Sequence, residues 1–128
     1  MAEALAPTIR TFQVFPDVPD ALQPLLEIAN NLWWVWNPDA VELFRRLDRK
    51  LWEDVYHNPV KMLGTIDQPK LAAAAEDEGY MAHMNRVHAQ FRQHVDGKGW
   101  FAEHNPDKAG MKVAYFSAEF GLHESLPI

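Results

Sequence analysis

The sequence predicts a mainly α-helical protein, a small bundle of about five or six helices over residues 20–110, followed by one strand. Three observations support this prediction. Apolar residues recur at spacings of three and four from Leu22 onward. Asn-Pro pairs stand where new helices would begin. Only at residues 111–120 does the apolar pattern lose the helical period.

Length and composition favour one folded domain. The 128 residues are 48% hydrophobic and carry a formal net charge of −6. An acidic chain repels phosphate backbones, so we expect no nucleic-acid partner. The absence of cysteine excludes disulfides and thiol chemistry. The first residues show neither a signal-peptide pattern nor a membrane-length apolar run, so we expect a cytoplasmic protein with no membrane partner.

The first helical region follows a proline-containing stretch. Residues 1–19 show no sustained period, which predicts an extended N-terminal arm. From residue 20 a helical stripe begins that includes Leu22, Ala29, Trp33 and Trp36. These spacings place its members on one face of a helix.

Capping residues divide the next part of the chain. Asn37 and Asn58 each precede a proline, the pattern of a helix that starts with an N-cap and Pro at its first position. Asp48 predicts a break into a third helix that ends near Tyr56. Gly64 is expected to close the short helix that follows Asn58.

A longer helical region is expected from Asp67 to about Val95, with Gly79 as a possible division. Glycines at 97 and 99 are expected to end the helical part. Residues 111–120 are apolar on both faces, which is typical of a central strand in a parallel sheet. No second convincing strand occurs in the sequence, so we expect its neighbours to be missing and self-association to be possible.

The two most distinctive blocks are VAYFSAEFGLHESLPI at residues 113–128 and, within residues 22–66, NLWWVWNPDAVELFRRLD with HNPVKMLG. They resemble the bacterial α-glucan (glycogen/maltodextrin) phosphorylases. The resemblance implies the N-terminal fragment of a retaining glycosyltransferase, which releases glucose 1-phosphate from α-1,4-glucan ends with inorganic phosphate and pyridoxal phosphate. Residues 20–110 would be its helical N-terminal domain, and residues 111–128 would begin a truncated α/β catalytic region with two Rossmann domains.

The same resemblance assigns no catalytic and no cofactor-binding residue here, because the family's glycine-rich loop and cofactor lysine have no counterpart in this sequence. We therefore expect the fragment alone to be inactive and to need the remainder of the catalytic domain as its partner. Glu119 occupies a matching motif position, and His123 and Glu124 follow it. The resemblance implies that these three residues support the active site or bind substrate in the parent enzyme.

The tryptophan cluster leaves alternatives open. Trp33 and Trp36 share the apolar stripe and are expected in a core or domain interface. Trp34 falls off the stripe, so it is the best candidate for a glucan or domain contact. The helical unit could instead be a glucan-binding, regulatory or oligomerisation module, or a stand-alone interaction protein. His83, His88 and His94 lack the i,i+4 spacing of a helical zinc site, so no metal site is expected.

Overall fold

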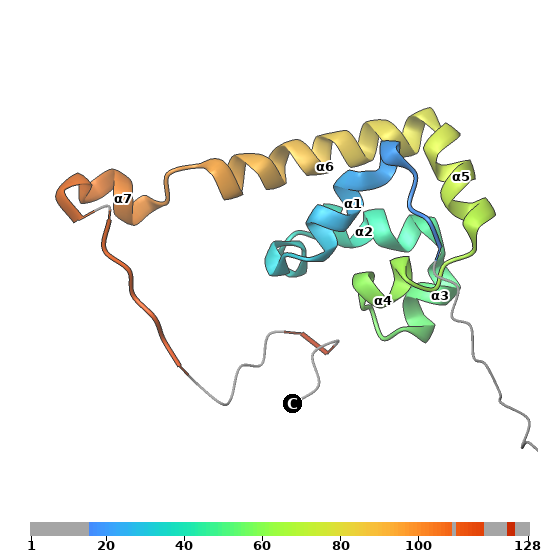
Figure 1. Cartoon of the computed structure of the whole chain (residues 1–128), viewed down its shortest axis with the longest axis horizontal. Helices are drawn as coiled ribbons and strands as arrows, with labels where there is room; N and C mark the ends of the chain where they lie inside the picture. Colours follow the sequence, from blue (N-terminus) through green and yellow to red (C-terminus); the bar gives the residue numbers. More distant parts are fainter. Residues whose placement is uncertain (1–15, 109, 117–122, 125–128) are drawn as a thin grey trace, which may run out of the picture.

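The computed structural model describes residues 16–108, 110–116 and 123–124, and within these ranges it contains seven α-helices and no strand (Figure 1). The mainly α-helical class is therefore confirmed. Helices α1 to α7 span Gln23–Ala29, Pro38–Leu47, Arg49–Asp54, Pro59–Leu63, Gln68–Glu76, Glu78–Asp96 and Trp100–His104. Three short 3₁₀ helices, η1 to η3, span Asp20–Leu22, Leu32–Trp36 and Pro106–Lys108. Most of the expected N-terminal arm lies outside the described residues.

Side-chain caps begin three of the helices where the sequence predicts them. The side chain of Asn37 accepts hydrogen bonds from the amides of residues 39 and 40 at the start of α2. Asp48 caps α3 and Asn58 caps α4 in the same way. Each cap pairs an amide that the first helical turn leaves without a backbone partner. The breaks expected at Asp48 and Gly64 are confirmed.

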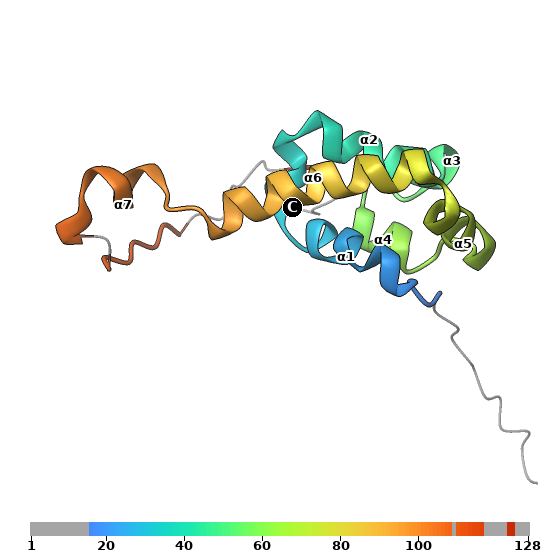
Figure 2. The same cartoon turned by 90° about the horizontal axis from the view of Figure 1, so that it is seen from above.

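Helix α6, with 19 residues, packs against α1, α2 and α5. It runs across α1 and α2, and α5 packs beside its first turns (Figure 1, Figure 2). The buried side chains of α6 face those of α1 and α2 and form one hydrophobic core with the aromatic rings of Trp34 and Trp52. The last turn of α6 extends beyond the bundle toward α7 (Figure 2). Within the described ranges, no helix combines the length and apolarity needed to cross a membrane.

The tryptophan-rich segment differs from the sequence expectation. Helix α1 ends at Ala29, and the side chain of Asn31 caps the separate 3₁₀ helix η2 by accepting from the amide of Trp33 across 2.9 Å. This break resets the helical phase. Trp34 is consequently buried, with 2% of its surface exposed, whereas Trp36 is 76% exposed. The expectation that Trp36 shares the core stripe and that Trp34 lies off it is wrong.

The C-terminal part also differs. Helix α7 lies beyond the glycines that were expected to end the helical part. Residues 111–116 form no strand, and their apolar side chains are exposed, with Phe116 at 90%. A strand requires a neighbouring strand for its backbone hydrogen bonds, and the described part of the chain offers none. The second half of the expected strand lies outside the described residues.

Candidate functional site at the end of α3

The turn after α3 places His57 in a defined position. The amide of Tyr56 donates to the carbonyl of Glu53, and the amide of His57 donates to the carbonyl of Trp52, both across 3.0 Å. These two bonds form a Schellman motif, which closes the carboxyl end of a helix. Tyr56 and His57 have φ angles of 55° and 56°, in the left-handed region that glycine usually occupies. Neither position holds a glycine, so both residues adopt a backbone conformation that is unfavourable for a residue with a Cβ atom.

The imidazole of His57 lies between two carboxylates. Its Nε2 is 2.8 Å from Oε2 of Glu53, on the preceding helix. Its Nδ1 bonds Oε1 of Glu124, which lies 67 residues further along the chain. The ring also packs on the indole of Trp52, with centroids 5.2 Å apart. The bond to Glu124 raises the pKa of His57, and Glu53 acts in the same direction against the effect of burial.

A second contact joins the same C-terminal residues to the bundle. The His123 ring meets the Trp34 indole edge to face, with centroids 4.7 Å apart. Trp34 in turn packs edge to face on Trp52 at 6.0 Å. The partners of His123 and Glu124 are therefore neighbours within one aromatic cluster, Trp34, Phe44, Trp52 and His57.

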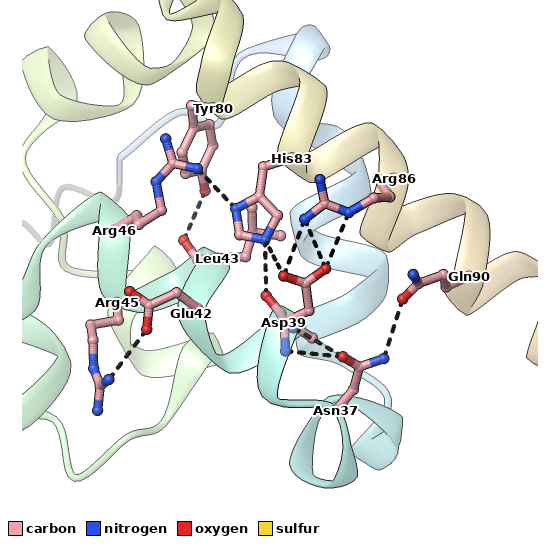
Figure 3. Close-up of polar contacts among 11 residues, drawn as sticks. Asn37, Asp39, Glu42, Leu43, Arg45, Arg46, Tyr80, His83, Arg86 and Gln90 are labelled. Atoms are coloured by element: carbon pink, nitrogen blue, oxygen red, sulfur yellow. Dashed lines mark hydrogen bonds and ion pairs between the residues drawn. The ribbon is translucent and has the colours of Figure 1, made fainter.

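A separate polar cluster links α2 to α6 (Figure 3). His83 on α6 is only 6% exposed, and its Nδ1 lies 2.9 Å from Nη1 of Arg46. Its Nε2 lies 3.1 Å from both the carbonyl oxygen and Oδ1 of Asp39. The guanidinium of Arg86 donates to the same carboxylate at 2.9 Å. Hydrogen bonds from Arg86, together with its positive charge, lower the pKa of Asp39.

Tyr80 completes this cluster on the buried side. Its hydroxyl donates to the carbonyl of Leu43 across 3.2 Å, and the guanidinium of Arg46 lies 5.4 Å from its ring centroid. Burial raises the pKa of the Tyr80 phenol, because the charged form would lose its hydration. Each member of the cluster therefore bonds another part of the fold, which is the arrangement of a structural joint between two helices.

The structure describes three of the four site residues that the sequence predicts. His123 and Glu124 come together with Trp34 at the end of α3, while Glu119 lies outside the described residues. The burial of Trp34 leaves its indole in contact with Phe44, Trp52 and His123 rather than with solvent. Sequence reasoning missed His57 and His83. Local sequence gives no signal for the contact of His57 with Glu124 or for the contacts of His83, because these partners are 67 and 37 or more residues away.

The contacts shown for His57, His123 and Glu124 include ion pairs and aromatic packing. No group of three or more histidine or acidic side chains in these ranges is arranged to hold a metal ion. The described ranges thus define a small helical domain to which its own C-terminal residues return.

Comparison with known proteins gives the family. Residues 18–126 match the family described as "Protein of unknown function (DUF3417)", and the chain belongs to this family. It is 30% identical over 93% of its length to a glycogen phosphorylase of Mycobacterium tuberculosis. It is 33% identical over 91% to a maltodextrin phosphorylase of Thermococcus litoralis and 33% identical over 81% to a glycogen phosphorylase of Aquifex aeolicus.

The chain spans about 14% of the length of these relatives. No solved structure matches it. The predicted resemblance to the N-terminal region of α-glucan phosphorylases is therefore confirmed.

Proposed function

We propose that this chain is a structural, non-catalytic domain of a cytoplasmic α-glucan phosphorylase. The parent enzyme would use inorganic phosphate to release glucose 1-phosphate from the ends of α-1,4-glucans. The observation that carries the proposal is the 30–33% identity to phosphorylases over most of this chain. Residues 20–110 would form the helical domain, and residues 111–128 would begin the catalytic domain. Glu119, His123 and Glu124 would support the active site there.

Pyridoxal phosphate, the cofactor implied by the resemblance, does not fit the residues of this chain. A lysine that forms a Schiff base is usually desolvated or placed beside another cation. Every lysine here is exposed, and Lys50 and Lys70 form ion pairs with Asp54 and Asp48. We therefore assign the binding of pyridoxal phosphate to the rest of the catalytic domain of the parent enzyme.

The exposure of the apolar side chains at residues 111–116 supports the proposal that a partner covers this segment. Val113, Tyr115 and Phe116 are all at least 79% exposed, whereas the core of the bundle is already filled by other side chains. Burial of an aromatic or aliphatic side chain of this size contributes about 1.5–3 kcal/mol. The remainder of the catalytic domain would supply that burial, and a second copy of the chain could supply it through self-association.

The proposal is tested with one substitution in two settings. The chain alone is expected to release no glucose 1-phosphate from glycogen and phosphate. A chimera in which this chain replaces the matching part of the Aquifex aeolicus phosphorylase is expected to be active. Phe116→Asp should lower the melting temperature of the chimera and leave that of the chain alone unchanged. Phosphorolysis by the chain alone, or equal shifts in the two settings, would contradict the proposal.

A second function, glucan binding, is favoured by one observation. The indole of Trp36 is 76% exposed on η2, and sugars stack on exposed aromatic faces. Trp34, the residue expected from the sequence to make a glucan contact, is buried and would serve the domain-contact alternative instead. Affinity electrophoresis in glycogen gels tests this function. Retardation that Trp36→Ala abolishes would support it, and unretarded migration of the native chain would exclude it.

A further inference from the structure

The two carboxylates beside His57 can both accept a hydrogen bond from the ring only if the ring is protonated. Both ring nitrogens face a carboxylate oxygen, Nε2 that of Glu53 and Nδ1 that of Glu124. A carboxylate only accepts hydrogen bonds, and a neutral imidazole has a single N–H. Only the imidazolium form donates to both carboxylates. Loss of one proton therefore leaves a ring lone pair facing a carboxylate oxygen.

The backbone holds His57 where it can make both contacts. The Schellman bonds fix residues 56 and 57 relative to α3, and Glu53 lies on the last turn of that helix. Trp52 supports one side of the ring at 5.2 Å. Glu124, by contrast, belongs to a segment outside the bundle, and its side chain is 59% exposed. The movable member of the group is therefore Glu124.

His123, the residue before Glu124, makes a separate contact with the bundle. The His123 ring packs on Trp34 at 4.7 Å, and Trp34 packs on Trp52, the ring beneath His57. The ionic contact and the ring contact thus lie on one continuous aromatic surface. Weakening the ionic contact therefore weakens the attachment of this segment to the bundle.

We propose that His57 is a proton-operated latch that holds residues 123–124 against the helical bundle. The protonated ring donates one hydrogen bond to Glu124 and one to Glu53. When the imidazolium gives up one proton to solvent, the neutral ring keeps its hydrogen bond to Glu53 and releases Glu124 with its segment. This device goes beyond the proposed function and does not depend on it.

The direction of the pH dependence follows from the two partners. The charged groups acting on His57 are Glu124 and Glu53, and those acting on Glu124 are His57 and His123. Docking raises the pKa of His57 above its ordinary 6.5, so this contribution is complete below pH 6.5 and is lost as the pH rises through the docked value. Docking lowers the pKa of Glu124 below 4.5, so its contribution is complete above pH 4.5 and is lost in acid. Docking is therefore strongest between pH 4.5 and 6.5.

The full chain provides a clean test because it contains no cysteine. Ile128→Cys creates one thiol, four residues from Glu124 in the sequence, that can carry a nitroxide spin label. NMR then measures how strongly the label broadens the His57 ring and Trp52 indole signals. We expect the broadening to fall at least about threefold between about pH 5.5 and about pH 9, as the imidazole loses its proton.

Glu124→Gln is the decisive variant, because its amide keeps the shape of the side chain and removes its charge. Glu124 is exposed, so the fold should not depend on it. The broadening should be weak at both pH values, and the titration of His57 should move toward 6.5. Glu103→Gln, which removes one negative charge from α7, should behave as the parent chain does. Equal broadening at the two pH values, or parent-like broadening in Glu124→Gln, would overturn the latch.

Discussion

Nη1 of Arg46 donates a hydrogen bond across 2.9 Å to Nδ1 of His83, which joins the end of α2 to α6 (Figure 3). A guanidinium has no acceptor, so Nδ1 is the nitrogen without hydrogen. Nε2 therefore carries the ring hydrogen and donates it to Asp39, whose carbonyl oxygen and Oδ1 both lie at 3.1 Å. The tautomer of His83 is fixed by its neighbours on α2, and the ring bridges both ends of that helix.

His83→Leu should destabilise the fold because it removes this bridge at a buried position. The carbonyl and carboxylate of Asp39 would lose a donor, and we expect the free energy of unfolding to fall by about 1–3 kcal/mol. Urea denaturation measures the change. His88→Leu on the same helix is the control. His88 pairs with the half-exposed Glu27 and stacks on Phe91, a contact that an apolar leucine can partly replace, so the change should cost less than about 1 kcal/mol. Equal losses in the two variants would contradict the bridging role.

Trp34→Ala and Trp36→Ala should separate the core tryptophan from the surface one. Trp34 is buried against Phe44 and Trp52, so its truncation should cost about 3–5 kcal/mol. Trp36 is exposed, and its truncation should change stability by no more than about 0.5 kcal/mol. Thermal unfolding followed by circular dichroism measures both. A larger loss of stability in Trp36→Ala than in Trp34→Ala would contradict this assignment and support the apolar stripe that the sequence spacing predicts.

The tryptophan segment shows why periodicity failed locally. A single α-helix from residue 20 to residue 36 would place Trp36 with the core residues. Asn30 and Asn31 interrupt that helix, and a 3₁₀ helix turns by three residues rather than 3.6. The phase after the break therefore cannot be extrapolated from the phase before it. The asparagine pair was the available signal, because asparagine favours caps and turns.

Local signals were sufficient where one residue sets a boundary. Asn37, Asp48 and Asn58 cap their helices as predicted, because a cap depends on amides two or three residues away. The contact between His57 and Glu124 has no such signal. It depends on the course of the chain through α4, α5, α6 and α7 before the C-terminal residues return to the bundle (Figure 1). The family resemblance singled out Glu124 but gave no partner for it.

Tyr56→Gly should stabilise the chain. Tyr56 has a φ angle of 55°, and a residue with a Cβ atom is strained there by about 1 kcal/mol or more. Its ring is 71% exposed, so little packing is lost. We expect the free energy of unfolding to rise by about 0.5–1 kcal/mol once the greater freedom of glycine in the unfolded chain is included.

Tyr56→Ala is the matched control, because it removes the ring and keeps the strain. It should leave stability within about 0.5 kcal/mol of the parent chain. The difference between the two variants in urea denaturation isolates the backbone contribution. Equal stabilities for the glycine and alanine variants would show that the turn carries no strain at this residue.

Acid should weaken the joint between α2 and α6 through Asp39. The hydrogen bonds and the positive charge of Arg86 hold the pKa of Asp39 below its ordinary 3.8. A lowered pKa in the folded state means that the carboxylate contributes stability above pH 3.8, and that this contribution is lost as the pH falls through the folded value. Stability of the parent chain should therefore decline on acidification in part through this group.

Asp39→Asn separates this contribution from the other carboxylates. The variant should be less stable than the parent near neutral pH, and the difference should shrink as the pH falls from 3.8 through the lowered pKa of Asp39, because both side chains are uncharged below that pKa. Arg86→Gln removes the main donor to Asp39 and should likewise reduce the acid-dependent part of the stability. Urea midpoints measured from about pH 6 to about pH 2 give these curves. A constant gap between the parent and Asp39→Asn across that range would mean that the charge of Asp39 contributes nothing, and that its amide serves the α2–α6 joint equally well.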